Sequence, residues 1–149
     1  MKKLITSIVI ALGLLSTSCT NAQTPAQSSS GNVTVLTTEA FKTKIVDFDA
    51  SQEWNFKGDK PAIIDFYADW CGPCKVTAPI LESLAEDYKG QIDVYKVNVD
   101  NEPQLAALFG IRSIPSILFI PKEGKPQMSV GAMSREDFNE AIKTVLLTK

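Results

Sequence analysis

The fold of this chain is most clearly encoded in the segment Ala62-Ile63-Ile64-Asp65-Phe66-Tyr67-Ala68-Asp69-Trp70-Cys71-Gly72-Pro73-Cys74. Its first six residues are almost entirely apolar, which predicts a central strand over 62–67 that is covered on both faces. Apolar residues recur at helical spacing after the cysteines, which predicts a helix over 71–88. Two cysteines three positions apart at such a strand-to-helix junction can close a small disulfide ring and open it again.

The two cysteines predict thiol–disulfide redox chemistry. Cys71 is expected at the helix N-terminus, where unpaired backbone N–H groups and the helix dipole favour the thiolate, which attacks other disulfides. Pro73 falls in the first helical turn, which accepts proline. We interpret Cys71 as the nucleophile and the more enclosed Cys74 as the residue that resolves the mixed disulfide. A buried structural pair is the alternative, and it fits poorly with the exposure expected of Trp70 and Gly72.

Composition limits the other chemistry that the chain can carry. Its 149 residues are 44% hydrophobic and 21% charged, which suits one globular domain with a core. A net charge of −2 gives no electrostatic footprint for nucleic acid. With no histidine and three cysteines, the sequence cannot supply a His-based zinc site, a Cys-His dyad or a Cys₄ site, so we expect no metal or other cofactor. Metal binding by the cysteine pair alone would need a dimer, and we expect a monomer.

The first residues resemble an export signal. Two lysines precede an apolar stretch over 4–15 that is too short to span a bilayer comfortably. The residues before Cys19 resemble a bacterial lipobox, although Ser16 stands where an aliphatic residue is usual. The signal peptide would then be 1–18, and Cys19 would become the lipidated N-terminus. Ordinary cleavage after Ala22 is the alternative, in which case Cys19 is lost with a leader over 1–22.

Residues 19–32 are expected to form a flexible tether between that leader and the folded domain. Positions 20–32 carry no charge and no large apolar side chain, so they cannot bury enough surface to offset the entropy of ordering. The folded domain is predicted over 33–149. Together these segments predict an exported protein that is either soluble in the periplasm or anchored to a membrane as a lipoprotein.

The rest of the chain predicts alternating strands and helices followed by a hairpin. This alternation implies an α/β fold with a parallel sheet covered on both faces, to which the hairpin adds an antiparallel edge. A capping-box-like start at Ser134 opens the last helix, whose inner face should carry Phe138, Ile142 and Val145. The remaining expected elements are strands over 33–36, 92–99, 116–120 and 127–130, helices over 38–46 and 104–109, and a loop over 49–60.

Five sequence motifs, taken in order, resemble those of the thioredoxin family. The similarity runs from about residue 63 to residue 147, with motifs at 65–75, 78–81, 96–100, 110–116 and 130–132. The resemblance implies the thioredoxin fold, a central mixed sheet with helices on both faces, and the activity of a protein-disulfide reductase. Two features depart from the family pattern. The leader and tether change the compartment, and the longer stretch over 47–60, which contains Trp54, could alter the choice of partner.

Asp65 and Lys96 are candidate ionisable residues of the site. Asp65 interrupts the apolar strand, and a desolvated carboxylate has a raised pKa and can exchange a proton near neutral pH. Because the chain has no histidine, we expect Asp65 to act as the base for Cys74, directly or through a water. Lys96 interrupts the next strand and could pair with Asp65. The alternative is that both side chains lie in solvent near strand ends.

Pro115 precedes the strand expected over 116–120. The resemblance implies a cis-proline that faces the cysteines, beside backbone groups that pair with a bound substrate chain as an added strand. A simple turn proline is the alternative. Around the cysteines we expect a flat apolar docking rim formed by Trp70, Gly72, Pro73, Ile114 and Gly131.

The favoured function is a thiol–disulfide oxidoreductase that reduces or isomerises disulfides in exported proteins through Cys71 and Cys74. The Gly-Pro pair between the cysteines, as in the thioredoxin family, favours a reducing protein, whereas a net oxidant usually has histidine there. The alternatives are a specialised reductant for cytochrome c maturation and a non-catalytic binding module of the same fold. The chain has no distinctive insertion for the first, and the intact cysteines with Asp65 argue against the second. An exported reductant would need an inner-membrane thiol–disulfide electron donor.

Overall fold

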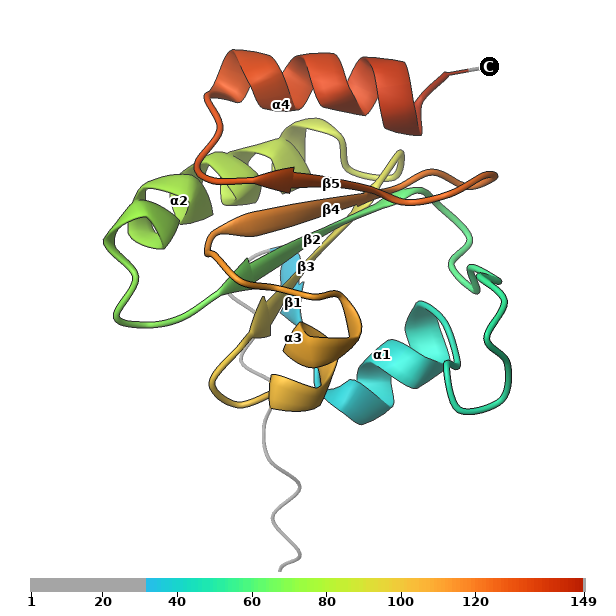
Figure 1. Cartoon of the computed structure of the whole chain (residues 1–149). Helices are drawn as coiled ribbons and strands as arrows, with labels where there is room; N and C mark the ends of the chain where they lie inside the picture. The colour runs from blue at the N-terminus through green and yellow to red at the C-terminus, as the bar shows by residue number, and fades with distance from the viewer. Residues whose placement is uncertain (1–31, 149) are drawn as a thin grey trace, which may run out of the picture.

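The centre of the fold is a mixed β-sheet, seen in a computed structural model that describes residues 32–148 (Figure 1). Its strands are β1 (Val33–Val35), β2 (Ala62–Tyr67), β3 (Asp93–Asn98), β4 (Ser116–Ile120) and β5 (Gln127–Val130). The sheet order is β1-β3-β2-β4-β5, in which β1, β3 and β2 run parallel. Strand β4 runs antiparallel to both β2 and β5. The expected parallel sheet with an antiparallel edge is therefore confirmed.

Helices cover both faces of this sheet. They are α1 (Thr38–Lys44), α2 (Gly72–Asp87), α3 (Pro103–Leu108), α4 (Arg135–Ala141) and the π-helical turn η1 (Ile142–Leu146) that continues α4. Helices α2 and α4 lie on one face, and α1 and α3 lie on the other (Figure 1). The expected capping box opens α4, with Ser134 and Asp137 exchanging hydrogen bonds. The predicted elements are found with bounds within two residues of those expected.

Strand β2 occupies the middle of the sheet and is buried on both faces, as its apolar sequence predicts. Ile63 packs with Leu81 in the hydrophobic cluster beneath α2 and α4. Ile64 and Phe66 belong to the cluster on the opposite face, beneath α1 and α3. Because side chains alternate along a strand, Asp65 shares the face of Ile63 and lies on the α2 side of the sheet.

The inner face of the C-terminal helix carries the three predicted residues and one more. Phe138 and Ile142 are fully buried as expected, Val145 is half-buried and packs against the same core, and its neighbour Leu146 is buried as well. The reason is the π-helical turn, in which the Leu147 N–H donates to the Ile142 carbonyl at 2.9 Å. A hydrogen bond to the fifth residue back widens the turn and brings Leu146 onto the inner face beside Val145.

The segment over 47–60, which departs from the family pattern, packs against α1 and α3. Trp54 is half-buried and lies edge-on to Phe109, with ring centroids 6.4 Å apart. Phe48 packs on Phe41 of α1, with ring centroids 6.2 Å apart. This segment therefore covers the face of the sheet opposite to α2. Its influence on the choice of partner stays a prediction.

The expected leader and the lipidation site Cys19 lie outside the described residues, as does the expected tether apart from Asn32. Within residues 32–148, no helix is long and apolar enough to cross a bilayer.

Candidate redox site

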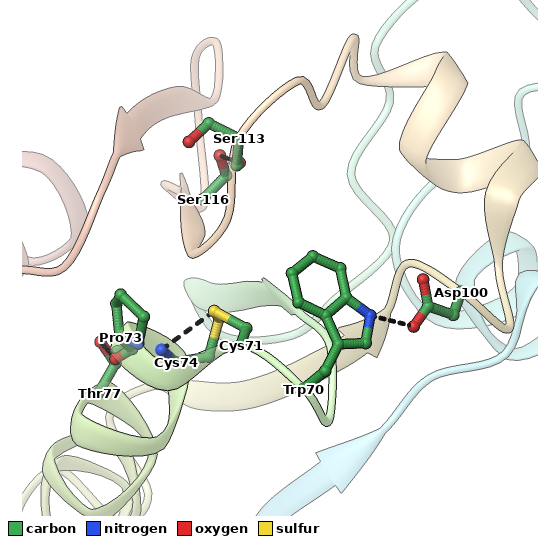
Figure 2. Close-up of a disulfide and its surroundings, with 8 residues drawn as sticks. All are labelled: Trp70, Cys71, Pro73, Cys74, Thr77, Asp100, Ser113 and Ser116. Carbon is green, nitrogen blue, oxygen red and sulfur yellow. Dashed lines mark hydrogen bonds between the residues drawn. A yellow bond between two sulfur atoms is a disulfide. The ribbon is translucent and has the colours of Figure 1, made fainter.

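The cysteine pair lies at the N-terminus of α2, where β2 leads into the helix. Cys71 is the N-cap residue and Pro73 lies in the first turn, as the sequence predicts. Cys71 and Cys74 form a disulfide, with a Cα–Cα distance of 5.3 Å. The backbone N–H of Cys74 donates to Sγ of Cys71 at 3.2 Å, shown as a dashed line in Figure 2. A helix-N-terminal donor is thus aimed at the sulfur of Cys71, where negative charge on a thiolate would be stabilised.

The disulfide is buried, although the residues beside it in the sequence are exposed. Trp70 is 71% exposed, and Gly72 and Pro73 are also exposed. Cys71 and Cys74 are each only 3% exposed. The expectation that Cys74 is the more enclosed of the two is therefore wrong for this oxidised form. The disulfide holds both residues in one small apolar cluster, in which they are covered to the same extent.

Trp70 is fixed by a chain of hydrogen bonds that sequence analysis did not find. Its indole Nε1–H donates to Oδ2 of Asp100 at 2.8 Å (Figure 2). The backbone N–H of Asp100 donates to the side-chain carbonyl of Asn98, whose amide group donates to Asp69. The end of β3 therefore supports the loop that precedes Cys71. The one sequence signal for this hydrogen-bond chain was the run of polar residues at the end of that strand, within the motif at 96–100.

The Ile114–Pro115 peptide bond is cis, as the family resemblance implies. Ile114 packs against the cysteine pair, and the loop that carries Ser113 and Ser116 faces the disulfide in Figure 2. Within that loop, the Ser116 hydroxyl donates to the Ser113 carbonyl at 2.7 Å. The Gly131 N–H donates to the Pro115 carbonyl at 2.8 Å. These bonds join the proline loop to the end of β5 and hold both beside the disulfide.

The structure brings the expected rim residues together around the disulfide. Trp70 and Pro73 are exposed, while Ile114 and Gly131 are half-buried. Gly131 has a φ of +100°, a conformation that a residue with a Cβ rarely adopts, so glycine suits the tight turn after β5. Two further apolar side chains close in sequence to these residues are exposed, Val76 on α2 and Val130 at the end of β5.

Asp65 is buried, which rejects the alternative that it lies in solvent. It is 3% exposed, and its Oδ1 has no hydrogen-bond partner within the described chain. The chain passes from the end of β2 to the start of α2 through residues 68–71, so Asp65 lies beneath the first turns of that helix. Cys74 and Thr77 are the buried residues of those turns. Burial raises the pKa of Asp65 to about 7, and the positive charge of Lys96 opposes this rise.

Lys96 lies beside Asp65 but does not bond to it. The two residues are register partners on the parallel strands β2 and β3. In the described chain, however, no ion pair within 4.0 Å joins them. Instead, Nζ of Lys96 lies 5.6 Å from the ring centroid of Tyr67, where the face of the ring attracts a cation. The expected direct pair is therefore replaced by a longer-range attraction.

Comparisons with known proteins agree with this geometry. A sequence model of the family described as Thioredoxin matches residues 32–144. The chain belongs to the thioredoxin family. It is 50% identical to a thioredoxin of Borreliella burgdorferi over 108 residues, covering 72% of this chain and 92% of that protein. It is also 36% identical to thioredoxin 1 of a Nostoc species, again covering 72% of this chain and 92% of the relative.

Comparison of the fold with solved structures gives the same family. A crystal structure of chloroplastic thioredoxin z superposes with a TM-score of 0.62 at 29% identity, covering 73% of this chain and 89% of that one. Thioredoxins are protein-disulfide oxidoreductases that act on disulfide-containing proteins. The Cys71–Cys74 disulfide is accordingly the redox-active pair of this chain.

Proposed function

We propose that the reduced protein breaks substrate disulfides in two steps. The Cys71 thiolate attacks one sulfur of the substrate disulfide, forming a Cys71–substrate bond and releasing the other substrate sulfur as a thiolate. The Cys74 thiolate then attacks Sγ of Cys71, which restores the Cys71–Cys74 bond and releases the second substrate sulfur. Two electrons pass to the substrate, and its two thiolates take up protons. The observation that carries this assignment is the hydrogen bond from the Cys74 N–H to the Cys71 sulfur.

In this scheme Asp65 accepts the proton that Cys74 must lose before it attacks. Support comes from its burial beneath the helix turn that carries Cys74 and from its pKa of about 7, at which a carboxyl group can both accept and release a proton in neutral solution. Lys96 acts on Asp65 through space and favours its ionised form. Lys96 thus acts on the reaction only through the charge of Asp65, and Asp65 is the base.

The substrate chain would bind as an added strand at the cis-proline loop. No hydrogen bond within the described chain uses the backbone N–H or carbonyl of Ile114, so both groups are available to a partner. Trp70, Pro73 and Gly131 supply the surrounding surface. Because these groups lie next to the disulfide, a strand paired with Ile114 would carry its own sulfur toward Cys71.

Net reduction is the direction that the chain favours. The cysteines enclose Gly72-Pro73, the dipeptide that the family resemblance associates with a reducing protein. A non-catalytic binding module would need neither an intact cysteine pair nor a buried carboxyl group without a hydrogen-bond partner. A role in cytochrome c maturation has no feature of the described chain in its favour.

The substrates would be exported proteins, and the protein itself would work in the periplasm. Support comes from the lysines and apolar stretch at the start of the chain and from Cys19 after them. Processing before Cys19 would make the protein a lipoprotein, and processing after Ala22 would leave it soluble. An exported reductant lies beyond the cytosolic reductants, so an inner-membrane thiol–disulfide carrier would reduce Cys71 and Cys74 again.

The test is turnover of a disulfide-bonded protein by enzyme that is kept reduced with a chemical dithiol. Cys71→Ser should lose turnover altogether, because the attacking sulfur is gone. Cys74→Ser, reduced beforehand and then freed of the dithiol, should still attack but stall at the mixed disulfide, because the resolving sulfur is gone. Substantial multiple-turnover activity in Cys71→Ser would overturn the proposed order of attack.

A further inference from the structure

A depression of about 420 Å³ lies beside the disulfide, on the side of Trp70. Its walls come from Trp70, from α3 and from the segment that leads to the cis-proline, with Ile111 and Ile114 among the apolar contributors. Trp70 directly precedes Cys71, and Ile114 packs against the buried cluster that contains both cysteines. A substrate segment that crosses the disulfide and pairs with Ile114 therefore has this depression within reach of its neighbouring side chains.

Arg112 is the one ionisable side chain among the residues that line this depression. It is exposed, and within the described chain no hydrogen bond or ion pair engages its guanidinium. Two carboxylates adjoin the lining residues along the chain or by a hydrogen bond, and each accepts hydrogen bonds from other groups. Asp100 accepts the Trp70 indole N–H, and Glu102 accepts both the backbone N–H and the hydroxyl of Thr38 at the start of α1. Both carboxylates keep their negative charge, because their hydrogen-bond donors are neutral, but within the described chain neither lies within 4.0 Å of the Arg112 guanidinium. Arg112 is therefore the one charged residue among those that line the depression.

We propose that Arg112 makes this protein prefer substrate disulfides that have an acidic side chain on the flank that crosses Trp70. A guanidinium presents two parallel N–H donors to a carboxylate, and the apolar walls would shield that pair from part of the solvent. A substrate lysine or arginine in the same place would face Arg112 with like charge. This preference rests on the proposed disulfide exchange at Cys71 and does not depend on the proposed roles of Asp65 or Lys96.

Matched synthetic peptides test this proposal. Each peptide carries one intramolecular disulfide and has Glu, Gln or Lys at the positions before or after its first cysteine. The rate constant is measured for oxidation of the reduced protein by each peptide at low salt. On one flank, the wild-type protein should react about two- to fivefold faster with the Glu peptide than with the Gln peptide, and slowest with the Lys peptide. Added salt should shrink this spread.

Three variants locate the effect. Arg112→Gln should bring the ratio of the Glu-peptide to the Lys-peptide rate constant to about one, and Arg112→Glu should make the Lys peptide the faster of the two. Lys143→Glu changes the net charge by the same amount at an exposed position on η1, far from the disulfide, and should keep the wild-type ratio. Because the readout is a ratio between peptides, a general loss of activity would not imitate the result.

Several outcomes would overturn the proposal. One is a wild-type ratio of Glu-peptide to Lys-peptide rate constants near one on both flanks. Another is an Arg112→Glu variant that keeps the wild-type ratio. The third is a Lys143→Glu variant that loses the ratio to the same extent as the Arg112 variants. The rate constant for the uncharged Gln peptide distinguishes failure of the Arg112 proposal from failure of the two-step scheme. If it oxidises the wild-type protein but no charge preference follows, disulfide exchange stands and the role of Arg112 falls.

Discussion

Replacing Asp65 by Asn should make the protein more stable, and increasingly so as the pH rises. The substitution keeps the shape of the side chain and removes its ability to ionise. A pKa of about 7 in the folded protein, against 3.8 for an ordinary Asp, corresponds to about 4 kcal/mol of stability that the native carboxyl group costs once it is fully ionised. The cause is burial, since a charge without a hydrogen-bond partner at Oδ1 has lost its water.

The sign of the pH dependence follows from the pH at which Asp65 ionises in the folded chain and in the unfolded chain. Below about pH 4 the carboxyl group is protonated in both the folded and the unfolded chain, so it costs nothing. Between about pH 4 and 7 the unfolded chain ionises while the folded chain keeps its proton, so the free energy of unfolding falls as the pH rises. Above about pH 7 both forms are ionised, and the difference levels off near its full value.

The assay is denaturant unfolding of the oxidised wild-type and Asp65→Asn proteins at several pH values. In the oxidised protein Cys71 and Cys74 do not titrate, and the chain has no histidine to obscure the result. The difference in stability between variant and wild type should grow by about 3 kcal/mol from about pH 5 to pH 8.5. The new amide group adds a contribution that does not vary with pH, so only the slope matters. A difference that stays flat over this range would refute the buried, near-neutral carboxyl group.

Two further perturbations test the support of Trp70 and the proposed anchoring. Asp100→Ala removes the acceptor of the Trp70 indole and should slow the reduction of protein disulfides several-fold while lowering stability by less than about 1 kcal/mol. Asp100→Asn keeps an acceptor oxygen and should retain most of the rate, and equal rates in both variants would contradict the support role. Cys19→Ala should release the protein from membranes without changing its purified activity. Intact mass of the native protein decides the matter, since an unlipidated chain that begins at Gln23 would exclude the anchor.

The sequence was most informative where local and tertiary forces agree. Strand β2 was predicted at 62–67 because both of its faces are buried, so nearly every residue is apolar. The cysteine pair was placed at a helix N-terminus because Pro73 and the preceding strand both require that boundary. Burial of Asp65 followed from its position within β2.

The differences come from interactions that no local pattern records. The π-helical turn after α4 brings Leu146 inward beside the predicted Val145, and its i to i+5 bonding has no distinct sequence spacing. Lys96 lies in register with Asp65 as expected, but its long side chain reaches the ring of Tyr67. The bond from Trp70 to Asp100 joins residues 30 positions apart, so it appears only once the sheet is assembled.

The central claim, attack by Cys71 and resolution by Cys74, is tested most directly by trapping the mixed disulfide. Cys74→Ser is expressed in intact cells, free thiols are blocked at lysis, and mass spectrometry identifies which protein cysteine is bonded to each captured partner. We expect the bonds to run through Cys71, with exported proteins as the partners. Absence of any substrate bonded to Cys71 in this variant would contradict the account.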